Sequence, residues 1–129
     1  MPTVNTKLLT ESNFLNLKSI DVNDINKHVL ELLVPSEQAV MAFKTVRDQV
    51  IFTTKRIIVV NVQGITGKKT SYISYPYAKI QYFGIETAGV LDIDSELILA
   101  FSDQAQLSFD FKSSIDIRKL NSIIAQYTL

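Results

Sequence analysis

The 129-residue chain contains no cysteine and no tryptophan, and it has one histidine, three prolines and four glycines. Without cysteine it has neither a disulfide framework nor a thiolate metal site, and cysteine nucleophiles are excluded. The lack of disulfides fits a reducing compartment, so we expect a cytoplasmic protein. Lysine and arginine total 13, as do aspartate and glutamate, so no overall field attracts nucleic acid.

Long apolar runs are also missing. No segment approaches the roughly 20 apolar residues of a membrane span, and residues 1–7 lack the apolar core of a signal peptide. The length is typical of one domain. Residues 1–20 are polar with irregularly scattered apolar positions, so we expect a loosely ordered N-terminal arm. The alternative for this arm is a short amphipathic anchor for a membrane or a neighbouring subunit.

Helical periodicity begins after the arm. We predict an N-terminal helix at residues 22–33, within a segment 21–35 that Asp21 caps and Pro35 ends. The lone His28 lies beside its apolar stripe, and no second histidine or cysteine could complete a site with it. We therefore expect a solvated or locally hydrogen-bonded histidine without a catalytic role. The stripe consists of Val22, Ile25, Val29, Leu32 and Leu33.

The stretch at residues 50–62 contains two apolar runs around a polar break at 53–56. So short a break joins antiparallel strands, since parallel strands need a connection of about a dozen residues. Residues 57–60 are four β-branched apolar residues in a row, which predicts that both faces of that strand are covered. The stretch therefore predicts a hairpin at the centre of the core.

Other segments show the two-residue alternation of strands. Gly84 is expected to mark a bulge or a close approach, and Ser113 with Asp116 resembles a capping box before a C-terminal helix. Seven antiparallel strands and a closing helix, over residues 36–129, predict a mainly β fold. The order matches the pleckstrin-homology (PH) superfold, a barrel of two near-orthogonal antiparallel sheets capped by a helix. Besides the hairpin, strands are expected at residues 39–46, 69–75, 80–87, 94–101 and 106–112.

Three blocks resemble the bacterial PH-like domain family. They are FTTKRII at residues 52–58, GITGKK at 64–69 and IETAG at 85–89, followed by Asp92 and Asp94. The resemblance implies a PH-like fold in a stand-alone bacterial protein, often assembled as a symmetric ring, with no established catalytic or ligand-binding residues. Eukaryotic relatives of the fold often bind phosphoinositides through a long basic loop. Here that connection, residues 47–49, is short and nearly neutral, so the site is not carried over.

Two motifs resemble ligand-binding loops but lack residues that those loops require. GKKT at residues 67–70 lacks the glycine that a phosphate-binding loop needs at position 62 and the hydroxyl residue directly after the first lysine. The acidic run at 92–96 resembles a calcium loop, but Leu97 stands where the sharp turn requires glycine. Neither a metal nor a cofactor is therefore expected.

Four cations remain as a candidate anion contact if the fold brings them together: Lys55, Arg56, Lys68 and Lys69. The alternative is that they keep a sheet edge soluble. One histidine, no cysteine and no nucleophile-elbow pattern leave acid–base or nucleophilic catalysis without named residues, so we expect no enzyme.

The two-faced apolar strands at 57–60 and 97–101 favour a non-enzymatic assembly module, a ring-shaped homo-oligomer that uses sheet edges. The alternative is an adaptor that binds an anionic lipid surface or a protein or peptide partner through its cations or its N-terminal arm.

Overall fold

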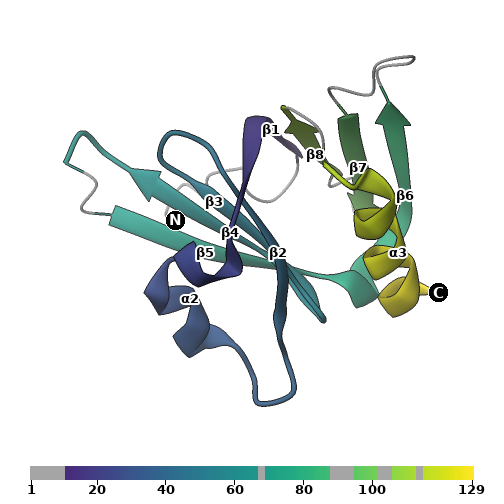
Figure 1. Cartoon of the computed structure of the whole chain (residues 1–129), viewed down its shortest axis with the longest axis horizontal. Coiled ribbons are helices and arrows are strands. Elements are labelled where there is room, and N and C mark those ends of the chain that lie inside the picture. Colours follow the sequence, from purple (N-terminus) through teal and green to yellow (C-terminus); the bar gives the residue numbers. More distant parts are fainter. Residues whose placement is uncertain (1–10, 67–68, 88–94, 102–105, 113–114) are drawn as a thin grey trace, which may run out of the picture.

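Eight β-strands and a C-terminal helix build the part of the chain that the computed structural model describes, residues 11–66, 69–87, 95–101, 106–112 and 115–129 (Figure 1). The strands form one sheet in the order β5-β4-β3-β2-β1-β8-β7-β6. Their bounds are β1 Glu11–Ile20, β2 Ala39–Lys44, β3 Gln49–Thr53, β4 Arg56–Gln63, β5 Lys69–Pro76, β6 Ile80–Thr87, β7 Ser95–Phe101 and β8 Gln106–Phe111. The helical elements are η1 Val22–Asp24, α2 Lys27–Leu32, η2 Tyr77–Lys79 and α3 Ile117–Thr128.

Strand β1 lies where we expected a loosely ordered arm, so that prediction is wrong for residues 11–20. It pairs antiparallel with β2 and parallel with β8, in a sheet predicted to be wholly antiparallel. The register with β8 shifts between the buried Phe14 and Leu17, and Asn16 has a positive φ of 60°. This irregularity places two core residues three positions apart, which hides the two-residue alternation of a strand. Residues 1–10 of the predicted arm lie outside the described residues.

The predicted N-terminal helix is divided into two short pieces. Asp21 caps η1, as expected, by accepting a hydrogen bond from the N–H of Asn23 at 2.8 Å. Ile25 is then extended, and the Asn26 side chain caps α2 by accepting from the N–H of His28 at 2.8 Å. A continuous helix is wrong here because a second capping residue starts a new helix in the middle of the apolar stripe.

Strands β3 and β4 form the predicted hairpin, and both faces of residues 57–60 are buried, with exposures of at most 1%. One face contributes Ile57 and Val59 to an inner core between the two halves of the sheet. The other contributes Ile58 and Val60 to an outer cluster. The outer cluster consists of Ile25, Val29, Ala42, Ile51, Ile58 and Val60. The chain's own N-terminal segment therefore supplies the cover predicted for the second face.

The inner core is larger and is closed by α3. Its buried residues are Phe14, Leu17, Phe43, Val50, Phe52, Ile57, Val59, Tyr77, Leu97, Leu99, Phe101, Leu107, Phe109, Phe111, Ile117, Leu120, Ile123 and Ile124. Helix α3 is capped by Asp116, which accepts from the N–H of Lys119 at 3.1 Å, whereas Ser113 lies outside the described residues. Gly84 marks no bulge: it lies opposite Ile98 in continuous register, and a Cβ there would meet no atom within 4 Å.

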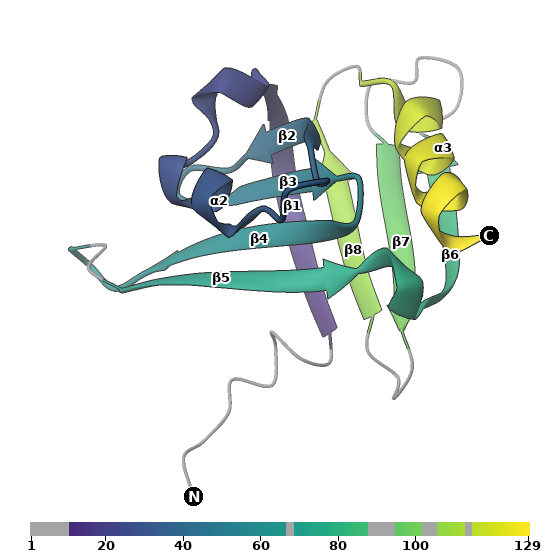
Figure 2. The same cartoon turned by 90° about the horizontal axis from the view of Figure 1, so that it is seen from below.

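The two halves of the sheet run across each other, as the PH-like prediction requires. Figure 2 shows β4 and β5 crossing the direction of β8 and β7, with β1 between the halves and α3 beside β6 and β7. Because β1 joins the halves, they form one open eight-stranded sheet instead of two separate sheets with seven strands. None of the described helices is long and apolar enough to cross a membrane.

Candidate functional site

The predicted cations do not come together. Lys55 and Arg56 lie at the turn between β3 and β4, whereas Lys69 lies opposite Gln63 at the far end of the β4–β5 hairpin. An eight-residue strand separates the two ends by about 23 Å. Lys68 lies outside the described residues. The described members of the predicted anion contact therefore do not form one site.

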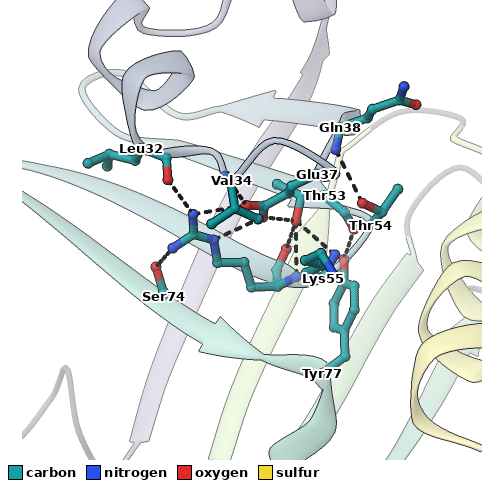
Figure 3. A network of polar contacts seen from close by, with 10 residues as sticks. Leu32, Val34, Glu37, Gln38, Thr53, Thr54, Lys55, Ser74 and Tyr77 are labelled. Atoms are coloured by element: carbon teal, nitrogen blue, oxygen red, sulfur yellow. Dashed lines mark hydrogen bonds and ion pairs between the residues drawn. The ribbon is translucent and has the colours of Figure 1, made fainter.

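Arg56 is engaged by groups of the protein itself, which belong to Leu32, Glu37 and Ser74, labelled in Figure 3. Its Nε donates to Glu37 Oε2 at 2.9 Å and its Nη2 to Glu37 Oε1 at 3.0 Å. The same guanidinium donates to the carbonyl of Leu32 at 2.7 Å and to the hydroxyl of Ser74 at 3.0 Å. With these four bonds, the guanidinium links the end of α2 and the segment after it to the sheet. We call this contact the staple.

Glu37 is the buried partner of this staple, since its side chain is 1% exposed. Thr53 donates its hydroxyl hydrogen to Glu37 Oε2 at 2.5 Å, and the Thr53 hydroxyl oxygen accepts from the backbone N–H groups of Lys55 and Arg56. Burial raises the pKa of the Glu37 carboxyl, but hydrogen bonds from Arg56 and Thr53 outweigh it, so the pKa lies below its usual value. Thr53 and Arg56 of the FTTKRII block therefore have a structural role, because both bind Glu37.

Tyr77 extends this network. Its hydroxyl donates to the carbonyl of Thr53 at 2.8 Å, and burial raises the pKa of its phenol well above the usual value. The network therefore ties η2 to the β3–β4 turn.

A different set of cations gathers where β1 and β2 meet. Lys18 lies directly opposite Lys44, and together with Arg47 they line a surface hollow of about 620 Å³. Like charges in direct cross-strand register destabilise a sheet. Two exposed apolar side chains, Leu15 and Val46, border the same hollow. We call these five residues the basic hollow.

The carboxylate of Asp48 also borders the basic hollow, but it is engaged elsewhere. Its oxygens accept from the N–H of Val62 at 2.9 Å and from the amide of Asn61 at 3.3 Å. Arg47 donates to the carbonyl of Gly64. Neither Lys18 nor Lys44 forms an ion pair with a described carboxylate.

A second hollow, of about 490 Å³, lies where the β3–β4 turn, η2 and the end of α3 meet. We call it the corner pocket. It is lined by Ser36, Thr54, Lys55, Tyr77, Ala78 and Tyr127. It contains one of the predicted cations, Lys55, next to two tyrosine rings.

The outer strands of the sheet carry few charges. β5 and β6 end the strand order, so the outer side of each has no neighbouring strand in the described sheet. Residues 70–76 of β5 and 80–85 of β6 contain no ionisable acid, lysine or arginine. Most of each edge strand therefore carries no charged side chain.

His28 is exposed on α2, and its Nδ1 lies 3.8 Å from Glu31 Oε2. The described residues contain no group of three or more histidines and carboxylates placed to hold a metal ion. The local, solvated environment predicted for this histidine is confirmed.

Sequence reasoning does not identify Glu37, Lys18 or Lys44. Glu37 stands alone in a loop 19 residues before Arg56, and Lys18 lies in the segment expected to be an arm. A signal for Lys18 would have been the strand itself, which the irregularity at Asn16 concealed.

Known proteins resemble this chain over most of its length. A family model described as bacterial PH domain matches residues 8–128. The uncharacterized protein YjqA of Bacillus subtilis (strain 168) is 38% identical over 112 residues, which are 85% of this chain and 90% of that relative.

Two solved structures share the fold. A DUF1696 family protein with a pleckstrin-homology domain from Shewanella loihica PV-4 has a TM-score of 0.76 and 35% identity, over 89% of this chain and 99% of its own. A pleckstrin homology domain from Shewanella amazonensis SB2B has a TM-score of 0.62 and 40% identity, over 85% and 90% of the two chains.

Proposed function

Since the chain belongs to the bacterial PH domain family, we propose that it is a non-enzymatic assembly module, which forms a symmetric homo-oligomer through its sheet edges. The edge strands β5 and β6 support this proposal, because residues 70–76 and 80–85 carry no charged side chain. Natural proteins commonly protect an exposed edge with charged side chains, because an uncharged edge can pair with another strand. Pro76 limits pairing only at the last residue of β5.

The two-faced strands no longer motivate this proposal. The outer face of residues 57–60 is covered by Ile25 and Val29 of the N-terminal segment, and on the second face of β7 Ala100 is buried and Ile98 is half-buried. The apolar surplus of these strands is therefore largely satisfied within one chain. The edges become the surface through which we expect copies to meet.

The charges at the ends of the two edges favour one orientation. β5 begins with Lys69, and β6 carries Glu86 near its end. If β5 of one copy pairs antiparallel with β6 of the next, Lys69 comes near Glu86, whereas parallel pairing brings it near Ile80. Such a contact joins two different surfaces, so repeated contacts close into a ring when the rotation permits.

The test is the oligomeric state measured by light scattering at micromolar concentration. We expect the wild type to form an oligomer and Tyr82→Lys, on edge strand β6, to shift it toward the monomer. Tyr82 is 61% exposed, so the substitution leaves the core intact. Leu30→Lys on α2, at a side chain that is 53% exposed, is the matched control and should remain oligomeric. A wild-type protein that is only monomeric would exclude the proposal.

A second candidate function is adhesion to an anionic lipid surface through the basic hollow. Three cations beside two exposed apolar side chains combine attraction to lipid head groups with shallow insertion. Each cation near such a surface contributes about 1 kcal/mol. This arrangement replaces the predicted contact at Lys55, Arg56, Lys68 and Lys69, whose described members are dispersed.

Vesicle co-sedimentation at low salt tests this second function. Vesicles of phosphatidylcholine with phosphatidylserine should bind the wild type, and the double variant Lys18→Gln/Lys44→Gln should bind about tenfold or more weakly. Lys27→Gln, at an exposed position on α2, is the control and should bind like the wild type. Equal sedimentation of wild type and double variant would exclude the basic hollow as the contact.

A further inference from the structure

We propose that the corner pocket binds a small organic monocarboxylate with a flat aromatic body. None of the lining residues belongs to the edge strands β5 and β6 or to the basic hollow, so this activity does not depend on either proposed function. Its walls come from four places in the chain: the segment after α2, the β3–β4 turn, η2 and α3. Figure 3 shows Thr54, Lys55 and Tyr77, three of the lining residues, close together.

The backbone around the pocket is held by hydrogen bonds. Thr54 donates its N–H to the carbonyl of Gln38 at 2.9 Å and accepts from the N–H of Gln38 at 3.2 Å through its hydroxyl. The N–H of Tyr77 donates to the carbonyl of Lys55 at 3.1 Å. These bonds fix the wall without any ligand, so little ordering free energy remains to be lost on binding.

The lining residues of the pocket include one charged side chain, and its charge is positive. Lys55 is the one ionised side chain among its lining residues, and it forms no ion pair with a described carboxylate. The nearby carboxylate, Glu37, is engaged by Arg56 and Thr53. One free ammonium group matches one anionic group, and a charge-assisted hydrogen bond to a carboxylate is roughly twice as strong as a neutral one.

The apolar side of the pocket is aromatic. The rings of Tyr77 and Tyr127 are nearly parallel, with centroids 6.1 Å apart and planes inclined by 19°. Tyr77 is buried, whereas Tyr127 is 41% exposed and can receive another flat group. The volume of about 490 Å³ lies within the range of about 300–1,000 Å³ typical of small-molecule sites. A carboxylate at Lys55 can therefore place its apolar body against Tyr127.

Heteronuclear NMR titration of the full chain tests the proposal, with N-acetylphenylalanine as probe and its neutral amide as the comparison. We expect saturable shifts of the backbone amides of Thr54, Lys55, Ala78 and Tyr127 at probe concentrations up to about 10 mM. The neutral amide should bind about tenfold more weakly, because it lacks the charge that Lys55 recognises. Absence of saturable shifts at these amides, or equal binding of the two probes, would overturn the proposal.

Substitutions test the contributions of the Lys55 charge and of the Tyr127 ring separately. Lys55→Met should weaken binding of the carboxylate about tenfold and leave the neutral amide unchanged, and Tyr127→Leu should weaken both probes about fivefold. Lys69→Met, an exposed lysine at the far end of the hairpin, is the matched control and should bind like the wild type. The substituted side chains are exposed, so each variant should keep the dispersed spectrum of a folded protein. Equal losses in Lys55→Met and Lys69→Met would show only general electrostatic attraction and would contradict the assignment.

Discussion

Strand β4 has an apolar cluster on each face, and the two clusters are enclosed in different ways. The inner core is closed by the second half of the sheet and by α3, and its aromatic rings contact one another directly. Phe52 lies 5.8 Å from Phe43 and 5.7 Å from Phe109, measured between ring centroids. In the outer cluster, which has six buried residues, Ile25 between η1 and α2 and Val29 of α2 cover the residues of the sheet.

The cover of the outer cluster is short. Helix α2 has six residues and η1 has three, whereas isolated helices in water need about 12 to 15 residues to be even marginally stable. The staple, in which Arg56 binds the carbonyl of Leu32 at the end of α2 and Glu37 in the segment after it, holds this cover in place. The comparison shows that apolar packing encloses one face of β4, and that a polar contact completes the enclosure of the other.

The largest effect should follow from emptying the inner core. Phe52→Ala removes a fully buried ring with two aromatic neighbours and should lower the free energy of unfolding by about 4 kcal/mol. Urea denaturation measures this loss. Val46→Ala, at a fully exposed side chain between β2 and β3, should change it by less than about 0.5 kcal/mol. A loss for Phe52→Ala as small as that of the control would contradict the central place of this residue in the core.

Breaking the staple should cost somewhat less. Arg56→Gln leaves the buried Glu37 carboxylate without its cation and should lower the free energy of unfolding by about 3 kcal/mol. The neighbouring variant Lys55→Gln should be nearly neutral, since Lys55 makes no ion pair with a described carboxylate. If the two variants were equally stable, the network would not hold the N-terminal segment.

A substitution in the outer cluster should lower the free energy of unfolding by less, and its effect should be more local. Val29→Ala removes two buried methyl groups and should cost about 2 kcal/mol. Hydrogen exchange should accelerate most in α2, while the amides of β7 and β8 remain protected. Leu30→Ala, one residue away and exposed, serves as the control. Uniform acceleration over the whole sheet would show that the two clusters unfold together.

Lowering the pH should produce the smallest effect on the free energy of unfolding. Burial raises the pKa of Glu37, but hydrogen bonds from Arg56 and Thr53 bring it below its ordinary value in the folded protein. The resulting stability is complete above the unfolded pKa of about 4.3 and is lost as the pH falls through the folded pKa. The difference in unfolding free energy between wild type and Glu37→Gln should therefore be constant near neutral pH and shrink below about pH 4. Urea titrations across this range measure it, and a difference that stays constant in acid would contradict an ionised Glu37.

Local patterns predicted much of this fold. The strand at residues 80–87 is confirmed to the residue, because its ends coincide with a break after Pro76 and a glycine-containing turn sequence. The burial of both faces at residues 57–60 also followed from composition. The failures were at irregular points: Asn16 concealed β1, and Asn26 divided the N-terminal helix.

Local sequence patterns predicted less of the candidate sites than of the fold. Arg56 was expected to meet an anion from outside, but it is bound to Glu37, which no motif indicates. Lys55 was identified, but its tyrosine neighbours come from η2 and from α3, more than 70 residues further along in the case of Tyr127. Spacing along the chain carries no information on such distant neighbours.

The amino-acid sequence by itself determined the strands after residue 36, where the closing helix lies and that β4 is covered on both faces, because alternation, capping and burial of apolar runs are properties of neighbouring residues. Only the tertiary structure decided which element covers the second face, that Arg56 is a staple, and that Lys18 meets Lys44. These contacts join residues far apart in the chain, and their geometry is set by how the two halves of the sheet cross.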